Sequence, residues 1–312
     1  MAKRSSLSTL LLLLASVIWG SAFLAQGMGG EHVDPFTFTG IRFLMGALVL
    51  LPIIFFSDLN KKNKGIYIPL SREQKRALLI GGVVCGCVLT VAAFLQQAAL
   101  GGILGIEPTT PAKAGFITAL YILFVPIISL IFKKKTPASF WLCIAIAIVG
   151  FYFLCIAGTS FTLSGGDALT LLSSVAYSFH IVSIDRLADR CDSLKFSFMQ
   201  FLTVGVICSA IMLIAERPSL EQISLAMPSL LYAGVLSSGV AFTLQVVAQK
   251  DLHPAMATMI MSLEAVFALI TGIIFDHANN IPNFYEAIGS VLIFGAVLTA
   301  QLLPSKKQRS DK

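Results

Sequence analysis

The chain is poor in charge. Lys, Arg, Asp and Glu make up 12% of its 312 residues, about half of the ~25% that is usual in soluble proteins. Hydrophobic residues account for 56%, and the mean hydropathy is +0.86. The segments between the apolar runs are short and rich in Gly, Pro or charge, so no soluble domain fits between them. This composition excludes an ordinary soluble protein and indicates a polytopic membrane protein.

Several catalytic and energy-coupling motifs are also missing. The sequence contains no GxxxxGK[ST] loop, which argues against ATP-driven work by this chain. It has no HExxH, no GxSxG and no paired aspartates at membrane depth, the patterns that intramembrane enzymes need. An ion channel needs a filter or a ring of charge, which a single intramembrane acid does not supply. We therefore expect neither an enzyme nor a bound cofactor.

The cysteines and basic residues do not suggest a redox or nucleic-acid role. Most of the six cysteines lie in apolar runs, so no disulfide framework is implied. The formal charge of +6 comes from short basic clusters between apolar runs. Such clusters are topology signals in membrane proteins. We expect the lipid bilayer, and not nucleic acid, to be a partner.

Ten apolar windows are long enough to cross a bilayer. The first follows Lys3 and Arg4 and resembles a signal peptide, but its apolar run continues past the small residues, so we expect a retained helix. All Lys and Arg residues except Arg42, Lys113 and Arg217 fall on one side if both termini are cytoplasmic. The predicted helices are 7–26, 35–57, 77–100, 112–132, 140–157, 168–187, 196–215, 229–249, 253–275 and 285–303.

The two halves of the chain repeat each other. LASVIWGSAF at 14–23 aligns with LSSVAYSFHI at 172–181, a shift of 158 that also places Arg42 on Gln200. A shift of 152 relates the third and eighth helices, and a shift of 143 relates the fourth and ninth. Because five helices per half reverse the direction of entry, we expect an inverted pair of repeats. The predicted units are 7–157 and 166–303, followed by a cytoplasmic tail, 304–312.

A family resemblance rests on these repeats and on four motifs. They are ASVIWGSAF at 15–23, IRFLMGALVLLP at 41–52, AGFITALYILFVPIIS at 114–129 and SLEAVFALITGIIF at 262–275. Together they resemble the EamA-type ten-helix members of the drug/metabolite transporter superfamily. The resemblance implies a secondary carrier, often an exporter of amino acids or other metabolites, whose cavity is formed by helices 1, 3, 4, 6, 8 and 9. Phe275-Asp276-His277 stands where that family usually has a glycine-glutamate pair.

Helical faces that mix small, aromatic and hydrogen-bonding groups supply the candidate cavity residues. Several of them fall near mid-depth, where the substrate sites of transporters lie. The aromatic candidates also have a packing interpretation, and His180 suits an interhelical hydrogen bond better than a metal. The candidate substrate-cavity residues are Trp19, Thr90, Gln97, Lys113, Thr118, Tyr121, Tyr177, His180, Gln245 and Glu264.

Glu264 is the one acid within the predicted ninth helix, about 16 Å from its start at ~1.5 Å per residue. Intramembrane acids are rare and commonly functional. A buried carboxyl group can load and release a proton, but it can also hold helices together as a neutral acid. Its equivalent in the fourth helix is Tyr121, so the halves differ in chemistry there. We predict that Glu264 forms one wall of the central cavity.

Three further residues carry two interpretations each. Lys113 can extend to the membrane surface or hold a substrate carboxylate. Arg42 lies about 10 Å into the second helix, which is peripheral in the resembling family, so structural pairing is favoured over substrate contact. Pro126 removes a backbone hydrogen bond and predicts either a gating kink or a permanent packing bend.

The resulting functional expectation is a non-ATP transporter in a bacterial-type plasma (inner) membrane. It would export amino acids or related small metabolites by alternating access, with protons as the possible coupling ion. A cavity for nucleotide sugars or sugar phosphates would need more Arg and Lys. The alternative within transport is broad-specificity efflux of drugs or toxic compounds.

Overall fold

The protein is helical throughout the part that the structure describes. The computed structural model describes residues 2–133, 136–157, 163–189, 191–275 and 284–302. No strand occurs within these ranges. Nine of their helical segments are long and apolar enough to cross a membrane, and a tenth apolar helix is shorter. The predicted all-α, ten-helix membrane fold is therefore confirmed.

The ten spans correspond to thirteen α-helices and two π-helical segments, because three of the spans are divided into two or three segments and a fourth ends in a π-helical turn. The first half contains α1 (Ala2–Gly30), α2 (Pro35–Asn63), α3 (Arg72–Gly101), α4 (Pro111–Ala119), α5 (Tyr121–Ile131) and α6 (Ala138–Cys155). The second half contains α7 (Gly165–Leu187), α8 (Ser193–Ile211), η1 (Met212–Glu216), α9 (Leu220–Leu231), η2 (Tyr232–Ala241), α10 (Phe242–Gln249), α11 (Pro254–Met261), α12 (Glu264–Phe275) and α13 (Phe284–Leu302).

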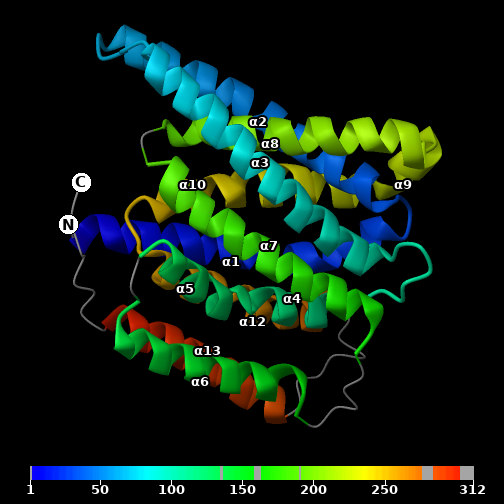
Figure 1. The fold of residues 1–312 in the computed structure, drawn as a ribbon. Coiled ribbons are helices and arrows are strands. Elements are labelled where there is room, and N and C mark those ends of the chain that lie inside the picture. The colour runs from blue at the N-terminus through cyan, green and yellow to red at the C-terminus, as the bar shows by residue number, and fades with distance from the viewer. Residues whose placement is uncertain (1, 134–135, 158–162, 190, 276–283, 303–312) are drawn as a thin grey trace.

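The spans run roughly side by side in layers (Figure 1). α6 and α13 pack on each other at one edge, while α2, α3 and α8 form the opposite edge. Between these edges lie α1, α7, α10 and the two interrupted spans, α4–α5 and α11–α12. α1 contacts segments of both halves. The central layers therefore have protein on several sides, which is where a membrane protein can keep polar groups away from lipid.

The two interrupted spans are built alike. Each begins with proline at its first helical position, preceded by a residue whose side chain accepts a backbone N–H: Thr110 in α4 and His253 in α11. In each span the turn before the second segment is tighter than an α-helical turn, because a backbone hydrogen bond joins residues three positions apart. The N–H of Leu120 donates to Ile117 O at 3.2 Å, and the N–H of Leu263 donates to Ile260 O at 3.2 Å. These positions correspond at the sequence shift of 143.

Pro126 does not lie at this interruption. It falls inside the continuous helix α5, six residues after Leu120. Leu120 is neither glycine nor proline, so no residue type marks the interruption in the sequence. Whether Pro126 serves as a gating bend stays a prediction. The fourth span is divided at Leu120.

α2 approaches η2 closely through glycine. A Cβ added to Gly46 would lie 2.9 Å from Ser238 Cβ, and one added to Gly234 would lie 2.8 Å from Met45 Cβ. Contacts this short leave no room for a side chain at either position. α2 therefore packs closely against the π-helical turns of η2. This packing places the middle of α2 near the central helices.

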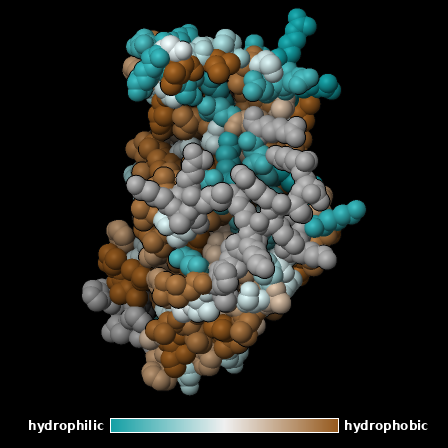
Figure 2. Space-filling model, turned by 90° about the vertical axis from the view of Figure 1, so that its left-hand side faces the viewer, coloured by the Kyte–Doolittle hydropathy of each residue, from teal (hydrophilic) through white to brown (hydrophobic). Residues whose placement is uncertain are grey.

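Charged residues gather at one end of the bundle. Figure 2 looks at that end, where hydrophilic side chains gather at the top of the view and hydrophobic side chains cover much of its left and lower parts. Lys61 pairs with Asp192 at 3.2 Å, and Lys195 pairs with Asp58 at 2.7 Å. The location of this end on the cytoplasmic side stays a prediction, as does the inverted relation of the repeats. The predicted tail 304–312 and the Asp276-His277 pair lie outside the described residues.

Candidate functional site

A cavity lies between the central helices. It has about 40 Å³ of free space, which is enough to hold water. Its walls come from all six spans that the resemblance implies, and also from α2. The lining residues are Trp19, Phe23, Gln26, Arg42, Gln96, Thr118, Tyr121, Tyr177, Ile181, Ser237, Phe242, Gln245, Met261 and Glu264.

Much of this lining consists of residues that correspond between the two halves. At the shift of 158, Trp19 corresponds to Tyr177 and Phe23 to Ile181; at the shift of 143, Thr118 corresponds to Met261 and Tyr121 to Glu264. All eight line the same cavity. The cavity therefore lies where equivalent faces of the two halves meet, which is the usual place of a site in a transporter with internal repeats.

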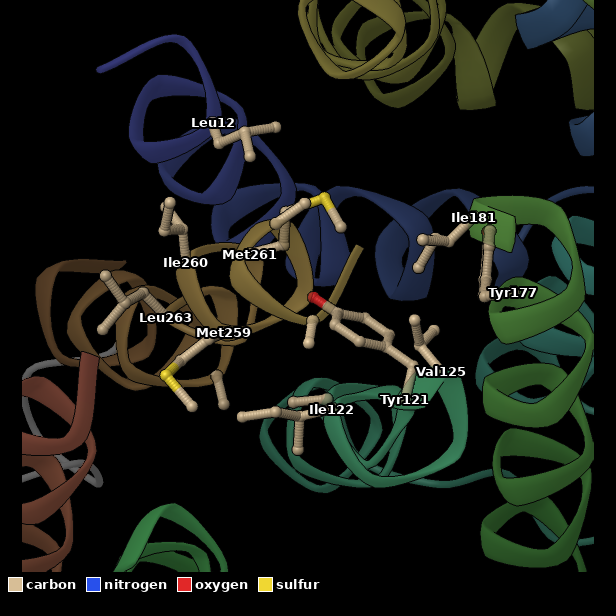
Figure 3. Packing of buried hydrophobic residues seen from close by; sticks show 14 of the residues in the cluster. Leu12, Tyr121, Ile122, Val125, Tyr177, Ile181, Met259, Ile260, Met261 and Leu263 are labelled. Atoms are coloured by element: carbon tan, nitrogen blue, oxygen red, sulfur yellow. The ribbon is translucent and has the colours of Figure 1, made fainter. Parts of the chain in front are cut away.

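Aromatic rings form one wall. Phe242, the first residue of α10, packs edge-on against Trp19 with ring centroids 4.9 Å apart. The ring of Tyr177 is stacked with the same Phe242 at 6.4 Å. Figure 3 shows the hydroxyl group of Tyr121 extending from α5 toward Met261, while Ile181 extends from α7. Such a wall offers apolar contact area together with a few polar atoms at the ring tips.

A hydrogen-bonded row of polar side chains forms another wall. The hydroxyl of Tyr177 donates to Gln96 Oε1 at 3.2 Å, and Gln96 Nε2 donates to Thr118 Oγ1 at 3.2 Å. These three residues come from α7, α3 and α4. Gln96 was not among the sequence candidates, because Gln97 was chosen from the same helix. The row fixes the orientation of Tyr177 at the cavity.

Glu264 lines the cavity from the first position of α12, and it is 3% exposed. The start of α12 is continuous with the preceding turn, because Ala265 N donates to Ser262 O at 3.3 Å and Phe267 N donates to Leu263 O at 3.0 Å. The Tyr121 hydroxyl lies within electrostatic reach of this carboxyl group. The two groups are close enough to interact as hydrogen-bond partners, but among the described residues neither Tyr121 Oη nor Glu264 Oε1 has a partner in good hydrogen-bonding geometry.

Arg42 also lines the cavity, although its helix was expected to be peripheral. Its side chain is 1% exposed. The guanidinium lies over the ring of Phe43, with Cζ 4.9 Å from the centroid, and within electrostatic reach of the Tyr177 phenol. Its Nε and Nη2 atoms have no hydrogen-bond partner among the described residues. The sequence favoured structural pairing of Arg42 over substrate contact. The geometry instead favours a position at the cavity, because the close packing of α2 on η2 brings Arg42 there.

Unpaired polar atoms concentrate at this cavity. Seven buried atoms on lining residues lack a hydrogen-bond partner among the residues described. Leaving one such group unpaired costs about 1–3 kcal/mol, so the cavity suits water or a polar ligand better than an apolar one. The seven atoms are Trp19 Nε1, Gln26 Oε1, Arg42 Nε, Arg42 Nη2, Tyr121 Oη, Gln245 Oε1 and Glu264 Oε1.

Six of the ten sequence candidates line this one cavity: Trp19, Thr118, Tyr121, Tyr177, Gln245 and Glu264. Their predicted role in substrate binding stays a prediction. The lining residues that sequence reasoning missed include Phe242 and Ser237. Phe242 was on the face considered for the eighth helix but was not selected, because a phenylalanine in an apolar span carries no functional signal of its own.

The structure places the other four candidates away from the cavity. His180 faces α8, where Nε2 and Gln200 Oε1 are 3.0 Å apart. Thr90 donates to Gly86 O within α3, and Gln97 Nε2 donates to Gln26 O. Lys113 lies near the start of α4, 3.6 Å from Asp167. His180 and Ile181 differ in helical phase: Ile181, four residues after Tyr177, lines the cavity, whereas His180 is not among the lining residues.

Comparison with known proteins identifies relatives along the whole chain. The sequence profile described as the EamA-like transporter family matches residues 6–156 and again residues 164–300. An uncharacterized transporter of Archaeoglobus fulgidus is 27% identical over 288 residues, covering 92% of this chain and 81% of that protein. The uncharacterized inner membrane transporter YedA of Escherichia coli K12 is 25% identical over 303 residues, covering 93% and 90%.

A solved crystal structure has the same fold. It superposes with a TM-score of 0.72 at 20% identity and covers 95% of this chain and 96% of its own. This likeness concerns the fold alone. The two profile matches together span far more than half of the chain, and their boundary falls between α6 and α7. The chain is therefore a multi-pass membrane protein that belongs to the EamA-like transporter family.

Proposed function

We propose that this protein is a secondary transporter that exports amino acids or related small metabolites by alternating access through the central cavity. The observation that carries the proposal is the cavity itself, which is lined by aromatic groups and by buried polar atoms without partners. Trp19, Tyr121 and Glu264 lie in the middle part of their spans. A binding site at this depth can be exposed to one side and then to the other by small movements of the surrounding helices.

The free space favours a small substrate. Free space of about 40 Å³ suits water-sized groups such as the ammonium and carboxylate of an amino acid. A larger molecule would require the walls to move further apart. The lining also holds both an acidic and a basic side chain, Glu264 and Arg42, and this combination suits a substrate that carries both charges.

Broad-specificity efflux is the second candidate. A carboxyl group beside aromatic rings is suited to lipophilic cations, and Glu264 lies in a cavity with Trp19 and Phe242. Arg42 in the same cavity would repel such cations. For this reason amino-acid export remains the proposal, and drug efflux is an outcome of its test.

The coupling step that we propose is proton exchange at Glu264. The sequence has no phosphate-binding loop, so the energy would come from an ion gradient or from the substrate gradient. The membrane would be the plasma (inner) membrane of a bacterial-type cell, in line with the name of the YedA relative.

Counterflow in proteoliposomes tests this function. Liposomes containing the purified protein would be loaded with unlabelled amino acids, one at a time, and uptake of the same labelled amino acid would be followed. Exchange above protein-free liposomes is expected for a subset of amino acids and not for tetraphenylphosphonium. Exchange of tetraphenylphosphonium without any amino acid would replace the proposal by drug efflux, and the absence of any exchange would refute both.

A further inference from the structure

We propose that Arg42 and Glu264 are the two ends of a zwitterion-binding site, in which Arg42 binds the substrate's carboxylate and Glu264 binds its ammonium group. This inference rests on the proposed function and adds the orientation of the substrate and the residues that select it. It starts from a basic and an acidic side chain that line one cavity, each almost completely buried: 1% exposed for Arg42 and 3% for Glu264.

Arg42 lacks an anionic partner of its own. Among the described residues no carboxylate lies within ion-pair distance of its guanidinium. A buried charge in a membrane protein is costly unless it is paired and hydrogen-bonded. The Tyr177 phenol is a neighbour, but a neutral hydroxyl does not neutralise the guanidinium. Two of the guanidinium's nitrogen atoms are left without acceptors, and a carboxylate can accept from two such donors at once.

The second half of the chain has an internal partner at the equivalent position. Gln200 corresponds to Arg42 at the shift of 158, and its Oε1 atom lies 3.0 Å from His180 Nε2 of α7, while its Nε2 atom has no partner among the described residues. The residue of α1 that corresponds to His180 is Ala22, which has no polar atom to offer. The position of Arg42 therefore has a larger and charged side chain but lacks the internal partner. An anion that enters the cavity, such as a substrate carboxylate, would accept from Arg42 Nε and Nη2, which no described residue does.

Glu264 is complementary. Its Oε1 atom has no partner in good hydrogen-bonding geometry among the described residues, and the aromatic residues Tyr121 and Trp19 line the same cavity. An ammonium group can donate to the carboxylate and lie against an aromatic face at the same time. Tyr177 is within electrostatic reach of both Arg42 and Glu264, and it lines the same cavity.

A set of four probes separates the two ends. L-leucine has both charges, L-leucinamide has the ammonium group alone, 4-methylpentanoate has the carboxylate alone, and 4-methylpentanamide has neither. The protein has two tryptophans, and Trp141 does not line the cavity. In a Trp141→Phe background, the fluorescence of Trp19 therefore reports binding at the cavity. Titration of purified protein with each probe gives four dissociation constants for each variant.

The expected result is a crossed pattern. Arg42→Gln should weaken L-leucine and 4-methylpentanoate at least about tenfold, since each loses charge-assisted hydrogen bonds, and should not weaken L-leucinamide, because it removes a charge that repels the ammonium group. Glu264→Gln should weaken L-leucine and L-leucinamide and spare 4-methylpentanoate. Arg42→Lys keeps the charge but not the two-pronged geometry, so it should restore part of the carboxylate binding.

Other outcomes would overturn the inference. If Arg42→Gln weakens all four probes equally, Arg42 only supports the structure. If the neutral probe binds the unsubstituted cavity as tightly as L-leucine, the charges do not select the ligand. Neither result would refute the proposed transport function, because counterflow tests that function separately. If Arg42→Gln does not fold, the preference of the Trp141→Phe protein for charged over neutral probes, together with Arg42→Lys, still decides. If no probe binds and no amino acid is exchanged, the proposed function falls as well.

Discussion

Tyr121 and Glu264 occupy the same position in two interrupted helices, and both line the central cavity. Tyr121 is the first residue of α5, and Glu264 is the first residue of α12. Each directly follows a tightened turn with the same backbone hydrogen bond, from Leu120 N to Ile117 O and from Leu263 N to Ile260 O. The two halves therefore place a phenol and a carboxyl group at equivalent points. The half that contains α12 supplies an acid to the cavity where the other half supplies a phenol.

The first prediction concerns proton coupling at this acid. Glu264→Gln keeps the shape of the side chain but removes the group that can exchange a proton. In proteoliposomes we expect exchange of saturating amino acid to persist while accumulation driven by a pH gradient is lost. Tyr121→Phe is the matched control and should retain gradient-driven accumulation. Undiminished pH dependence in Glu264→Gln would exclude this residue from coupling.

The second prediction concerns the contact between α1 and α12. A Cβ at Gly20 would lie 2.5 Å from Phe267 Cβ and 2.8 Å from two backbone atoms, Ala268 N and Glu264 O. Backbone cannot rotate away, so Gly20→Ala should destabilise the protein by about 1–3 kcal/mol. Thermal unfolding in detergent measures this change. Because α12 carries Glu264, transport should also fall.

Gly295→Ala is the control for that substitution. Gly295 lies in α13 with nothing within 4 Å of an added Cβ. Alanine forms helix better than glycine by up to about 1 kcal/mol, so this variant should be neutral or slightly stabilised. Equal unfolding temperatures for Gly20→Ala and Gly295→Ala would show that the close approach of α1 and α12 is not real.

The third prediction concerns Lys113, which pairs with Asp167 instead of facing the cavity. Asp167 accepts from Thr109 Oγ1 at 2.5 Å and from Ser164 N at 2.9 Å, and its side chain is fully buried. Asp167→Ala should therefore cost about 2–4 kcal/mol of stability, since it removes a helix cap and leaves buried donors unpaired. Lys113 is 28% exposed, so Lys113→Gln should cost about 1 kcal/mol at most.

Substrate affinity separates the two interpretations of Lys113. If it serves only the connection between α4 and α7, Lys113→Gln should leave the dissociation constant for L-leucine within about twofold of the parent protein. A loss as large as that of Arg42→Gln would mean that Lys113 contacts the substrate's carboxylate after all.

The fourth prediction uses two aspartates that correspond at the shift of 158. Asp192 precedes α8 and accepts from Leu194 N and Lys195 N, whereas Asp34 precedes α2 and makes no such bond with its side chain. Asp192→Ala should cost about 1 kcal/mol, as for other helix caps. Asp34→Ala should change the unfolding free energy by much less. Similar losses for the two would contradict the described geometry.

Asp192 also gives this prediction a pH dependence. Burial by itself raises the pKa of the Asp192 carboxyl, but the Lys195 backbone N–H and the Lys61 ammonium outweigh it, so the pKa is lowered. A lowered pKa means that the contribution is complete above the unfolded value of about 3.9 and is lost as the pH falls through the folded value. The difference in stability between the parent and Asp192→Ala should therefore shrink below about pH 4.

The sequence was sufficient for the spans but not for their interruptions. Hydrophobic length located all ten spans, because a bilayer demands about 20 apolar residues whatever the packing. The interruption at Leu120 depends on tertiary packing and has no proline or glycine to mark it. Pro126, the residue type that does predict a bend, lies within the continuous helix α5.

The candidate site was also predicted only in part from the sequence. Repeats at fixed shifts indicated which faces meet, and Trp19, Tyr177, Tyr121 and Glu264 do line one cavity. Arg42 could not be assigned in this way, since its position depends on the close approach of Gly46 to η2. His180 shared a plausible face with Tyr177, but a difference of one position turned it toward Gln200.

The most direct test of the central cavity is substrate protection of a single cysteine. Thr118 lines the cavity, whereas Thr90 of α3 does not, so Thr118→Cys and Thr90→Cys would be compared in a protein whose six natural cysteines are replaced by alanine or serine. Their reaction with a small methanethiosulfonate reagent would be followed in proteoliposomes, with and without an exchanged amino acid. The cavity account predicts that the amino acid slows the reaction at Thr118→Cys alone, and that the reaction there stops counterflow. Modification of Thr118→Cys that is indifferent to the amino acid and leaves counterflow intact would contradict it.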